Sequence, residues 1–275
     1  MNAVTQTGQV AISKERHGGR FWKRFASYAF ARSRQSVPIV LAELEPAASA
    51  FPLVFRSTAT GPVEPHALLH LTAGEASPFV TPEGSWRGTY VPSALRAHPF
   101  AATPTGAGGE MALLVDEASG LVTDDPKNEP FFDETGVPSA ALEQVIAFFR
   151  TRAQSELATQ TACAALQTAG LFRPLDPLPG MTEADAAGFL TIDSAALDAI
   201  DSAALPKLWH SGALRLAQAH RVSLCHAGWM ARALRAGADF TPRTTGPAAS
   251  SGADAGLSGF LDALADAQDH DRETP

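Results

Sequence analysis

The spacing of apolar residues changes about halfway along the chain of 275 residues. In the first half, short apolar runs are bounded by turn-forming residues, and prolines recur too often for a long helix. Strands are expected over residues 37–44, 53–56, 67–71, 88–91 and 111–116. This half of the chain is therefore predicted to be rich in strands.

From Pro138 onward the spacing becomes helical. Four apolar residues fall at i, i+3, i+4 and i+7: Leu142, Val145, Ile146 and Phe149. Pro138 with Ser139 supplies a helix start, and Gly170 supplies a stop. A short strand is expected at 189–193, a capped turn or short helix at 194–199, and helices over 205–219 and 222–236. This order predicts an α+β fold, in which a strand-rich N-terminal half packs against a helix-rich C-terminal half.

Composition divides the chain into four parts. Residues 1–36 form a basic, aromatic N-terminal arm and 37–240 an α+β domain, while 241–256 form a Pro-, Gly- and Ser-containing linker before the tail, 257–275. The tail carries an apolar stripe at helical spacing: Leu257, Phe260, Leu261 and Leu264. We expect this stripe to bind a protein partner as a detachable docking helix. Folding back onto the chain's own body, or a frayed tail, are the alternatives.

The arm concentrates positive charge on an otherwise acidic chain. Residues 1–36 hold seven Lys and Arg against one Glu, whereas the whole chain has a net charge of -8, which argues against a nucleic-acid binder. Five aromatic residues interleave with these bases: Phe21, Trp22, Phe25, Tyr28 and Phe30. The arm is either a patch for nucleic acid or anionic lipid, or a segment whose aromatics dock on the body while its bases face acidic surface or water. The second interpretation is preferred, because no nucleic-acid-binding fold signature accompanies the arm.

The apolar runs also bear on location. None approaches the ~20 residues of a membrane-spanning helix, and the N-terminus lacks the apolar core of a Sec signal. Cys163 and Cys225 show no metal-ligand spacing, so a reducing cytosol is the default. We therefore expect a cytoplasmic protein without a membrane span, and leave open its export to the cell surface by a signal-independent route.

The sequence contains few of the motifs that are typical of catalytic or metal-binding sites. The P-loop, the dinucleotide-binding glycine pattern and the nucleophile elbow are absent. His66 and His70 are four residues apart and share a face, but no third ligand accompanies them, so zinc is not expected. The acidic residues within 124–134 lack the spacing of a calcium loop. We predict no catalytic residue, no metal and no cofactor, and keep an enzyme with an unrecognised site as an alternative.

The densest group of functional side chains lies in residues 84–100. Aromatic residues and an arginine beside turns can form a binding cleft, so the candidate ligand-binding residues are Trp86, Tyr90, Arg96 and His98. The alternative is that Trp86, Tyr90 and Phe100 are core aromatics of a proline-rich corner. We expect at least two of these three aromatics to be more than half buried and to contact each other or Arg96.

Short motifs along residues 15–235 resemble, in order, those of the bacterial SapC family. The matching pieces are Tyr28-Ala-Phe-Ala31, Val37-Pro-Ile39 with Glu43, Phe51-Pro-Leu-Val-Phe55, Trp86 with Tyr90-Val-Pro92, Arg96 with Pro99-Phe100, Leu113-Leu-Val-Asp116, Gly170-Leu171, Phe189-Leu-Thr-Ile-Asp193, Ser211-Gly-Ala-Leu214, Ala219-His220 and Ser223-Leu224. Each piece is short, and the ordered set is what makes the resemblance specific. The sequence departs from the family at Ala97-His98, where a second basic residue and an aromatic are more usual, which weakens any anion-binding role for paired arginines.

The resemblance implies an association with a paracrystalline bacterial surface layer. It also implies that the protein is encoded near flavin-dependent tryptophan-halogenase-like proteins and outer-membrane receptors. The resemblance supplies no catalytic residue. We therefore expect a non-enzymatic accessory or interaction protein of a cell-envelope or surface-layer system. Its protein partner would be a halogenase-like flavoenzyme or a surface-layer component. The first alternative is a small-ligand or peptide-binding module that works with such a halogenase-like enzyme, and the second is the unrecognised enzyme.

Overall fold

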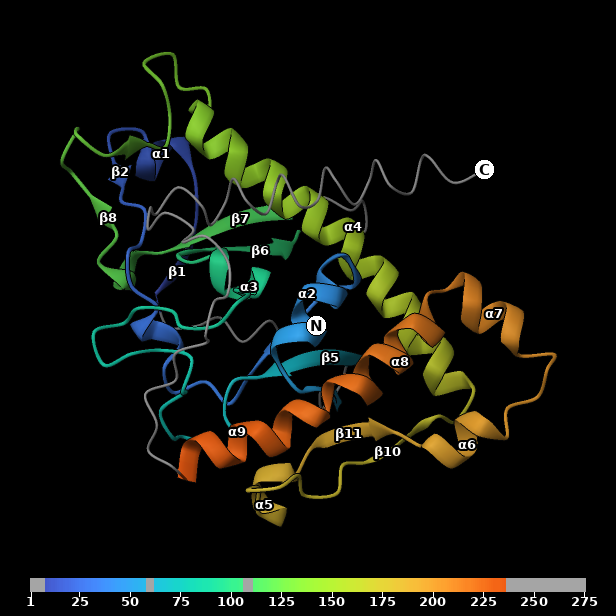
Figure 1. Cartoon of the computed structure of the whole chain (residues 1–275). Coiled ribbons are helices and arrows are strands. Elements are labelled where there is room, and N and C mark those ends of the chain that lie inside the picture. The colour runs from blue at the N-terminus through green and yellow to red at the C-terminus, as the bar shows by residue number, and fades with distance from the viewer. Residues whose placement is uncertain (1–7, 58–61, 106–110, 236–275) are drawn as a thin grey trace, which may run out of the picture. The chain divides into compact units, whose positions relative to one another are not determined.

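The computed structural model describes residues 8–57, 62–105 and 111–235. The fold is α+β, with strands mostly in the N-terminal half and helices toward the C-terminus, as the sequence predicts (Figure 1). The described residues form two compact units. One unit holds residues 8–26 and 97–154, and the other holds 27–96 and 155–235.

The first unit contains two three-stranded antiparallel sheets, in the orders β1-β7-β6 and β8-β2-β9. Its strands are β1 (Gln9–Ala11), β2 (Phe21–Trp22), β6 (Phe100–Pro104), β7 (Met111–Asp116), β8 (Val122–Thr123) and β9 (Glu129–Pro130), and its short helices are α1 (Lys14–His17) and η3 (Glu117–Ser119). The strand predicted over 111–116 is confirmed as β7. β6 pairs with it along the whole length of β6, from Phe100 opposite Val115 to Pro104 opposite Met111.

Residues 8–26 of the basic arm are built into this unit, whereas residues 27–36 belong to the second unit. Trp22 is buried, and its ring meets that of Phe100 edge to face at 4.9 Å. Three arginines of the arm pair with acidic residues of the same unit: Arg16 with Glu117 at 2.6 Å, Arg20 with Asp124 at 2.8 Å, and Arg24 with Glu129 at 3.4 Å. Residues 8–26 thus dock through Trp22 and turn three of their bases toward acidic side chains, as expected.

The second unit is built on a five-stranded antiparallel sheet in the order β10-β11-β4-β5-β3. Its strands are β3 (Ser36–Pro38), β4 (Leu53–Ser57), β5 (Val63–Leu68), β10 (Phe172–Pro174) and β11 (Phe189–Ile192). The predicted strands at 53–56 and 189–193 are confirmed. The large apolar core of this unit includes Phe51, Phe55 and Leu166, all of which are fully buried.

Helices make up most of the rest of the chain. They are η1 (Ala29–Ala31), η2 (Leu41–Glu43), α2 (Leu44–Ala50), α3 (Ser93–Arg96), α4 (Ala140–Thr168), α5 (Glu183–Ala186), α6 (Ser194–Asp198), α7 (Leu205–His210), α8 (Ala213–Ser223) and α9 (Cys225–Arg235). The start of α4 is the predicted one, because the Ser139 hydroxyl accepts a hydrogen bond from the Leu142 N–H (3.1 Å). Gly170 follows its end in a left-handed conformation (φ 66°), as a helix stop requires.

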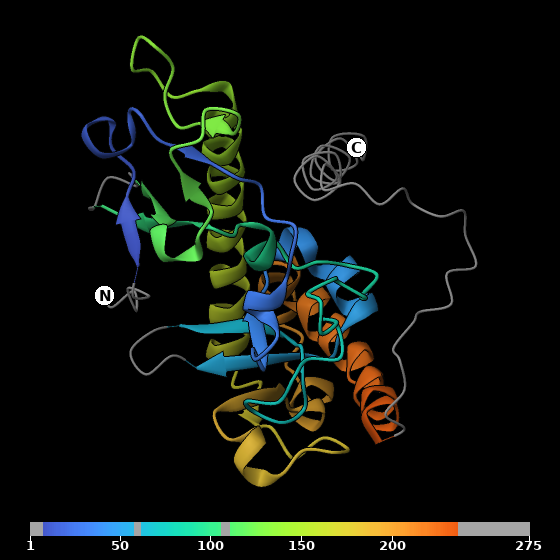
Figure 2. The same cartoon turned by 90° about the vertical axis from the view of Figure 1, so that its left-hand side faces the viewer.

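The helices α8 and α9 follow each other almost without interruption (Figures 1 and 2). Only Leu224 separates them, and its backbone is itself helical. α8 packs on α2 and on strands β4 and β11. In the described parts of the chain, no helix combines the length and apolarity that crossing a bilayer requires.

Four predicted elements need correction. The strand predicted over 67–71 begins earlier, at Val63, and ends at Leu68, as β5. The strand predicted over 37–44 ends at Pro38 and is followed by η2 and α2, because the Glu43 carboxylate accepts from the Val40 N–H (3.1 Å) and starts a helical turn there. Residues 88–91 form no strand, since the Tyr90 carbonyl accepts the indole N–H of Trp86 (2.9 Å) instead of a ladder hydrogen bond. The helix predicted over 205–219 is divided into α7 and α8 by Gly212, which has a φ of 74°.

Candidate functional site

Three of the four predicted ligand-binding residues come together in the second unit. Trp86 donates its indole N–H to the backbone carbonyl of Tyr90 (2.9 Å). Arg96 donates from Nη2 to the Tyr90 hydroxyl (3.0 Å), and its guanidinium carbon lies 5.5 Å from the centre of the Tyr90 ring. Tyr90 in turn donates its hydroxyl to Oε2 of Glu43 (2.7 Å). The group is therefore centred on a carboxylate that the sequence-based candidate set omits.

Glu43 is buried and accepts four hydrogen bonds from its own unit. Besides Tyr90, it accepts from the Val40 N–H at 3.1 Å, the Ser93 N–H at 2.7 Å and the Ser93 hydroxyl at 2.7 Å. The nearest Arg96 nitrogen lies 4.0 Å from Oε2. This network joins residues 40–43 to residues 90–96. The signal in the sequence was a single carboxylate that closes the apolar run of residues 37–42.

Burial shifts the pKa values of the two titratable side chains next to Glu43, those of Tyr90 and Arg96. It raises the pKa of Tyr90, and the negative charge of Glu43 adds to that rise, so the phenol stays a hydrogen-bond donor. Burial also lowers the pKa of Arg96, while Tyr90 and Glu43 act in the opposite direction. The hydrogen bonds from Val40, Tyr90 and Ser93 already occupy the Glu43 carboxylate, so a ligand would have to displace one of these donors. The arrangement therefore favours a buried structural hydrogen-bond network over an open ligand-binding site.

Aromatic rings surround this cluster. The Trp86 ring stacks on Phe79 at 5.9 Å and lies 5.3 Å from Tyr28. Trp86 and Tyr90 are partly buried against the core of the second unit, whereas Phe100 is buried within the first unit. The expectation that at least two of Trp86, Tyr90 and Phe100 are more than half buried, and contact each other or Arg96, is confirmed. This corner has the packing expected of core aromatics.

The fourth predicted ligand-binding residue, His98, belongs to the first unit. Its ring lies 5.6 Å from that of Phe25, at a steep angle of 72°. The structure thus groups His98 with the arm, and Trp86, Tyr90 and Arg96 with Glu43. The four predicted partner-binding residues, Leu257, Phe260, Leu261 and Leu264, lie outside the described residues.

The histidines that the sequence raised as metal ligands have other partners. His66 is buried and contacts the Ser36 hydroxyl at 3.0 Å, and Nδ1 of His70 accepts from the Thr72 N–H at 2.9 Å. Within the three described ranges, no three His, Cys, Asp or Glu side chains converge as metal ligands would. Burial raises the pKa of the Cys163 thiol to about 12, which keeps it protonated and unreactive.

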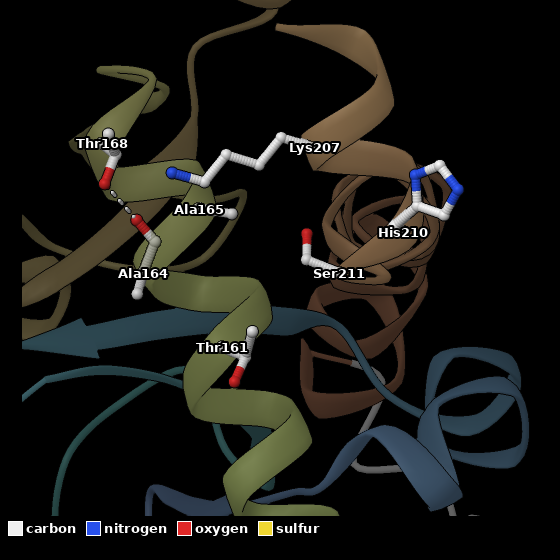
Figure 3. A pocket seen from close by; sticks show the side chains of 7 residues that line it. All are labelled: Thr161, Ala164, Ala165, Thr168, Lys207, His210 and Ser211. Carbon is white, nitrogen blue, oxygen red and sulfur yellow. Dashed lines mark hydrogen bonds between the residues drawn. The ribbon is translucent and has the colours of Figure 1, made fainter.

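A pocket of about 500 Å³ lies between α4 and α7 in the second unit (Figure 3). One face of α4 lines it with small side chains at i, i+3, i+4 and i+7: Thr161, Ala164, Ala165 and Thr168. Lys207, His210 and Ser211 line the opposite side, and the Lys207 side chain extends across toward α4 (Figure 3). The pocket therefore has a wall of small residues and a cationic rim.

The polar groups of the pocket differ in what they can offer a ligand. The Thr168 hydroxyl donates to the Ala164 carbonyl (2.8 Å), and the Ser211 hydroxyl donates to the Leu208 carbonyl (3.2 Å). Nδ1 of His210 donates to the Pro206 carbonyl (2.6 Å). The Lys207 ammonium, in contrast, makes no hydrogen bond or ion pair with any residue that the structure describes. A carboxylate is the group that this ammonium would attract.

Large apolar side chains are exposed on the elements that form the pocket. Trp209, on α7, is 72% exposed, and Leu157, one turn before Thr161 on α4, is 66% exposed. Leu208 is the single buried residue of the six in α7. Sequence reasoning misses this surface, because the sequence predicts α7 as part of one longer helix over 205–219. The signal was Leu205 and Trp209 one turn apart, beside residues that are nearly all small or polar.

One comparison with known protein families agrees with the resemblance. The model of the SapC family matches residues 12–228, which is most of the chain. No curated protein and no solved structure shows significant similarity to it. The chain therefore belongs to the SapC family.

Proposed function

We propose that this member of the SapC family is a non-enzymatic accessory protein that works by binding another protein. The observation that carries the proposal is the exposure of Trp209 on α7, beside the pocket that α7 forms with α4. Tryptophan is enriched among the residues that dominate protein interfaces, where its loss commonly costs 2 kcal/mol or more. A partner that covers α7 would remove this ring from water.

The charges carried by α7, α8 and α9 favour an acidic partner segment. No Asp or Glu occurs from Ser202 to Ala238, whereas five Lys and Arg residues do. Lys207 is one of these five, and it has no acidic partner among the described residues. An apolar side chain of the partner would fill the pocket and an adjacent carboxylate would meet Lys207. Complementary charge of this kind steers encounter and fixes register.

The biological setting of this role follows the family resemblance. A cell-envelope or surface-layer system is the proposed setting, with a surface-layer component or a halogenase-like flavoenzyme as the proposed partner. The cytoplasm is the proposed location, because Cys225 is an exposed free thiol and such thiols suit a reducing compartment. Fractionation of the producing cells would separate this location from signal-independent export to the surface.

The test is copurification of the full chain with its partner from cells that produce it. Trp209→Ala and Ala164→Phe, which fills the pocket from an exposed position on α4, should each lower partner recovery at least about tenfold, the equivalent of ~1.4 kcal/mol. Val137→Ala is the matched control, since Val137 is an exposed apolar residue of the first unit. Equal recovery with all three variants would rule out this surface.

A small-ligand or peptide-binding module, working with a halogenase-like enzyme, is the second candidate. The pocket volume of about 500 Å³ supports it, because it lies within the range of small-molecule sites. A ligand that binds only the folded chain raises its melting temperature by mass action. Small carboxylates and acidic peptides should therefore stabilise the native chain and not Ala164→Phe. A shift of equal size in both would place the binding elsewhere.

A further inference from the structure

A stripe of exposed residues runs along α8 and α9. Its members recur at steps of three or four residues: Arg215, Gln218, Val222, Cys225, Trp229 and Arg232. The middle of the stripe is apolar, with Val222 69% exposed and Trp229 39% exposed. On the opposite side, Ala227, Met230 and Ala231 are buried in the core of the second unit. The stripe is thus the outward face of a helix pair that is anchored on its other side.

Positive charge flanks the apolar middle of this stripe. Arg215 and Arg221 have acidic neighbours, since Arg215 lies 3.6 Å from Glu45 and Arg221 lies 3.8 Å from Asp198. Arg232 and Arg235, at the end of α9, make no ion pair with any residue in the described ranges. An acidic amphipathic segment would complement this face, with its apolar side over Val222 and Trp229 and its carboxylates near Arg232 and Arg235.

The chain itself contains such a segment. Residues 257–264 carry the apolar stripe of Leu257, Phe260, Leu261 and Leu264, and the acidic residues that follow or interrupt it are Asp262, Asp266, Asp269, Asp271 and Glu273, against Arg272 alone. This segment lies outside the described residues. Its pattern of charge and apolarity, read from the sequence, is the complement of the α8–α9 face.

The chain between the end of α9 and residue 257 is long enough for the tail to reach the exposed stripe of α8 and α9. Residues 236–256 separate the end of α9 from Leu257, and they are mostly Gly, Ala, Ser, Thr and Pro. A Gly- and Ser-rich chain of this length typically spans about 25 Å from end to end. Trp229 precedes Arg235 by six residues, about 9 Å along the helix axis. A segment tethered at this distance is present at an effective concentration in the millimolar range.

From these observations we infer that residues 257–271 bind in cis to the exposed stripe of α8 and α9. The segment would cover Val222, Cys225 and Trp229 and place its carboxylates against Arg232 and Arg235. The surface involved is not the α4–α7 pocket, so this inference stands or falls independently of the proposed function. A second copy of the chain, binding in trans, is the competing occupant.

Cys225 provides a direct measurement in the full-length protein. It is the exposed one of two cysteines, while Cys163 is buried, so a maleimide reagent under native conditions reports on Cys225. In the native chain the bound segment should slow this reaction. Leu261→Asp, which places a charge in the apolar stripe of the tail, should raise the rate at least about fivefold. Arg232→Glu combined with Arg235→Glu should raise it as well.

Ala263→Asp is the matched control, because it adds the same charge off the apolar stripe of the tail. This variant should react at the native rate, and raising the salt concentration should accelerate the native reaction. Equal rates for the native chain, Leu261→Asp and Ala263→Asp would overturn the inference. Protection that strengthens with protein concentration would also overturn it, in favour of binding between copies.

Discussion

The Tyr90 hydroxyl donates a 2.7 Å hydrogen bond to Oε2 of Glu43, and this contact joins two segments that lie 47 residues apart in the sequence. The same carboxylate holds Ser93 through its backbone N–H and its hydroxyl. Both Glu43 and Ser93 are buried. Since a buried charge is costly unless protein donors satisfy it, the donors around Glu43 and the helical turn that starts there depend on each other.

We expect Glu43→Ala to destabilise the protein strongly. The substitution leaves the Tyr90 hydroxyl, the Ser93 N–H and the Val40 N–H without their acceptor in a buried place, which should cost about 3–5 kcal/mol of unfolding free energy. Urea denaturation measures this change. Glu45→Ala is the control, because the Glu45 side chain is 65% exposed and should matter little. Similar losses for the two variants would contradict the role given to Glu43.

Trp86→Ala should lower the melting temperature. The ring contacts Phe79, Tyr28 and Phe51, and its N–H is bound to Tyr90, so truncation removes both packing and a hydrogen bond. The expected cost is about 3 kcal/mol. Trp209→Ala, a truncation of the highly exposed tryptophan, is the matched control and should leave the melting temperature within a degree or two. An unchanged melting temperature in Trp86→Ala would instead return this residue to the candidate binding surface.

The elements that the sequence predicted well are those with strong local signals. α4 combines four apolar residues at helical spacing with a Ser139 cap and a Gly170 stop, and the structure has all three features. Strand β7, over 111–116, is bounded as predicted. In these elements local propensity and tertiary packing agree, so the sequence pattern is sufficient.

The parts that were not predicted depend on contacts between distant residues. Strand β2 has two residues and exists because β8 and β9, about a hundred residues later, pair with it on both sides. The turn at Glu43 depends on hydrogen bonds from Tyr90 and Ser93, and the sequence around Glu43 does not predict these contacts. The α4–α7 pocket likewise requires two helices that are some forty residues apart to meet. Spacing along one segment carries no information of this kind.

Trp22→Ala should show that the arm is part of the folded unit. Trp22 is buried, pairs through β2 with two other strands and packs on Phe100, so its truncation should cost about 3–5 kcal/mol. Arg24→Ala serves as the control: its ion pair with Glu129 joins two partly exposed side chains and should contribute less than about 1 kcal/mol. Thermal unfolding of the variants measures both. Tight, salt-sensitive binding of the native chain to DNA or RNA would instead support the nucleic-acid interpretation of the arm.

The protein should lose stability in mild acid through His220. Nε2 of this buried histidine accepts from the Ile192 N–H (3.3 Å), while Nδ1 donates to the Leu53 carbonyl (2.9 Å), so the ring must be neutral to make both contacts. Burial lowers the pKa of His220 to about 4 in the folded protein, against about 6.5 when unfolded. Because the folded pKa is the lower one, the stabilisation is complete above pH 6.5 and is lost as the pH falls toward 4. The loss should amount to about 3 kcal/mol across this window.

His220→Gln isolates this effect from that of His17, whose pKa burial also lowers. The variant is expected to be less stable than the native chain at pH 7.5, because Gln cannot reproduce both ring contacts. The difference in unfolding free energy between the native chain and the variant should narrow by about 3 kcal/mol between pH 7 and pH 4, since Gln takes up no proton there. His210→Gln, on the exposed helix α7, should keep the pH dependence of the native chain. Urea unfolding at several pH values measures this difference, and a difference that stays constant would show that His220 is not the group whose protonation opposes folding.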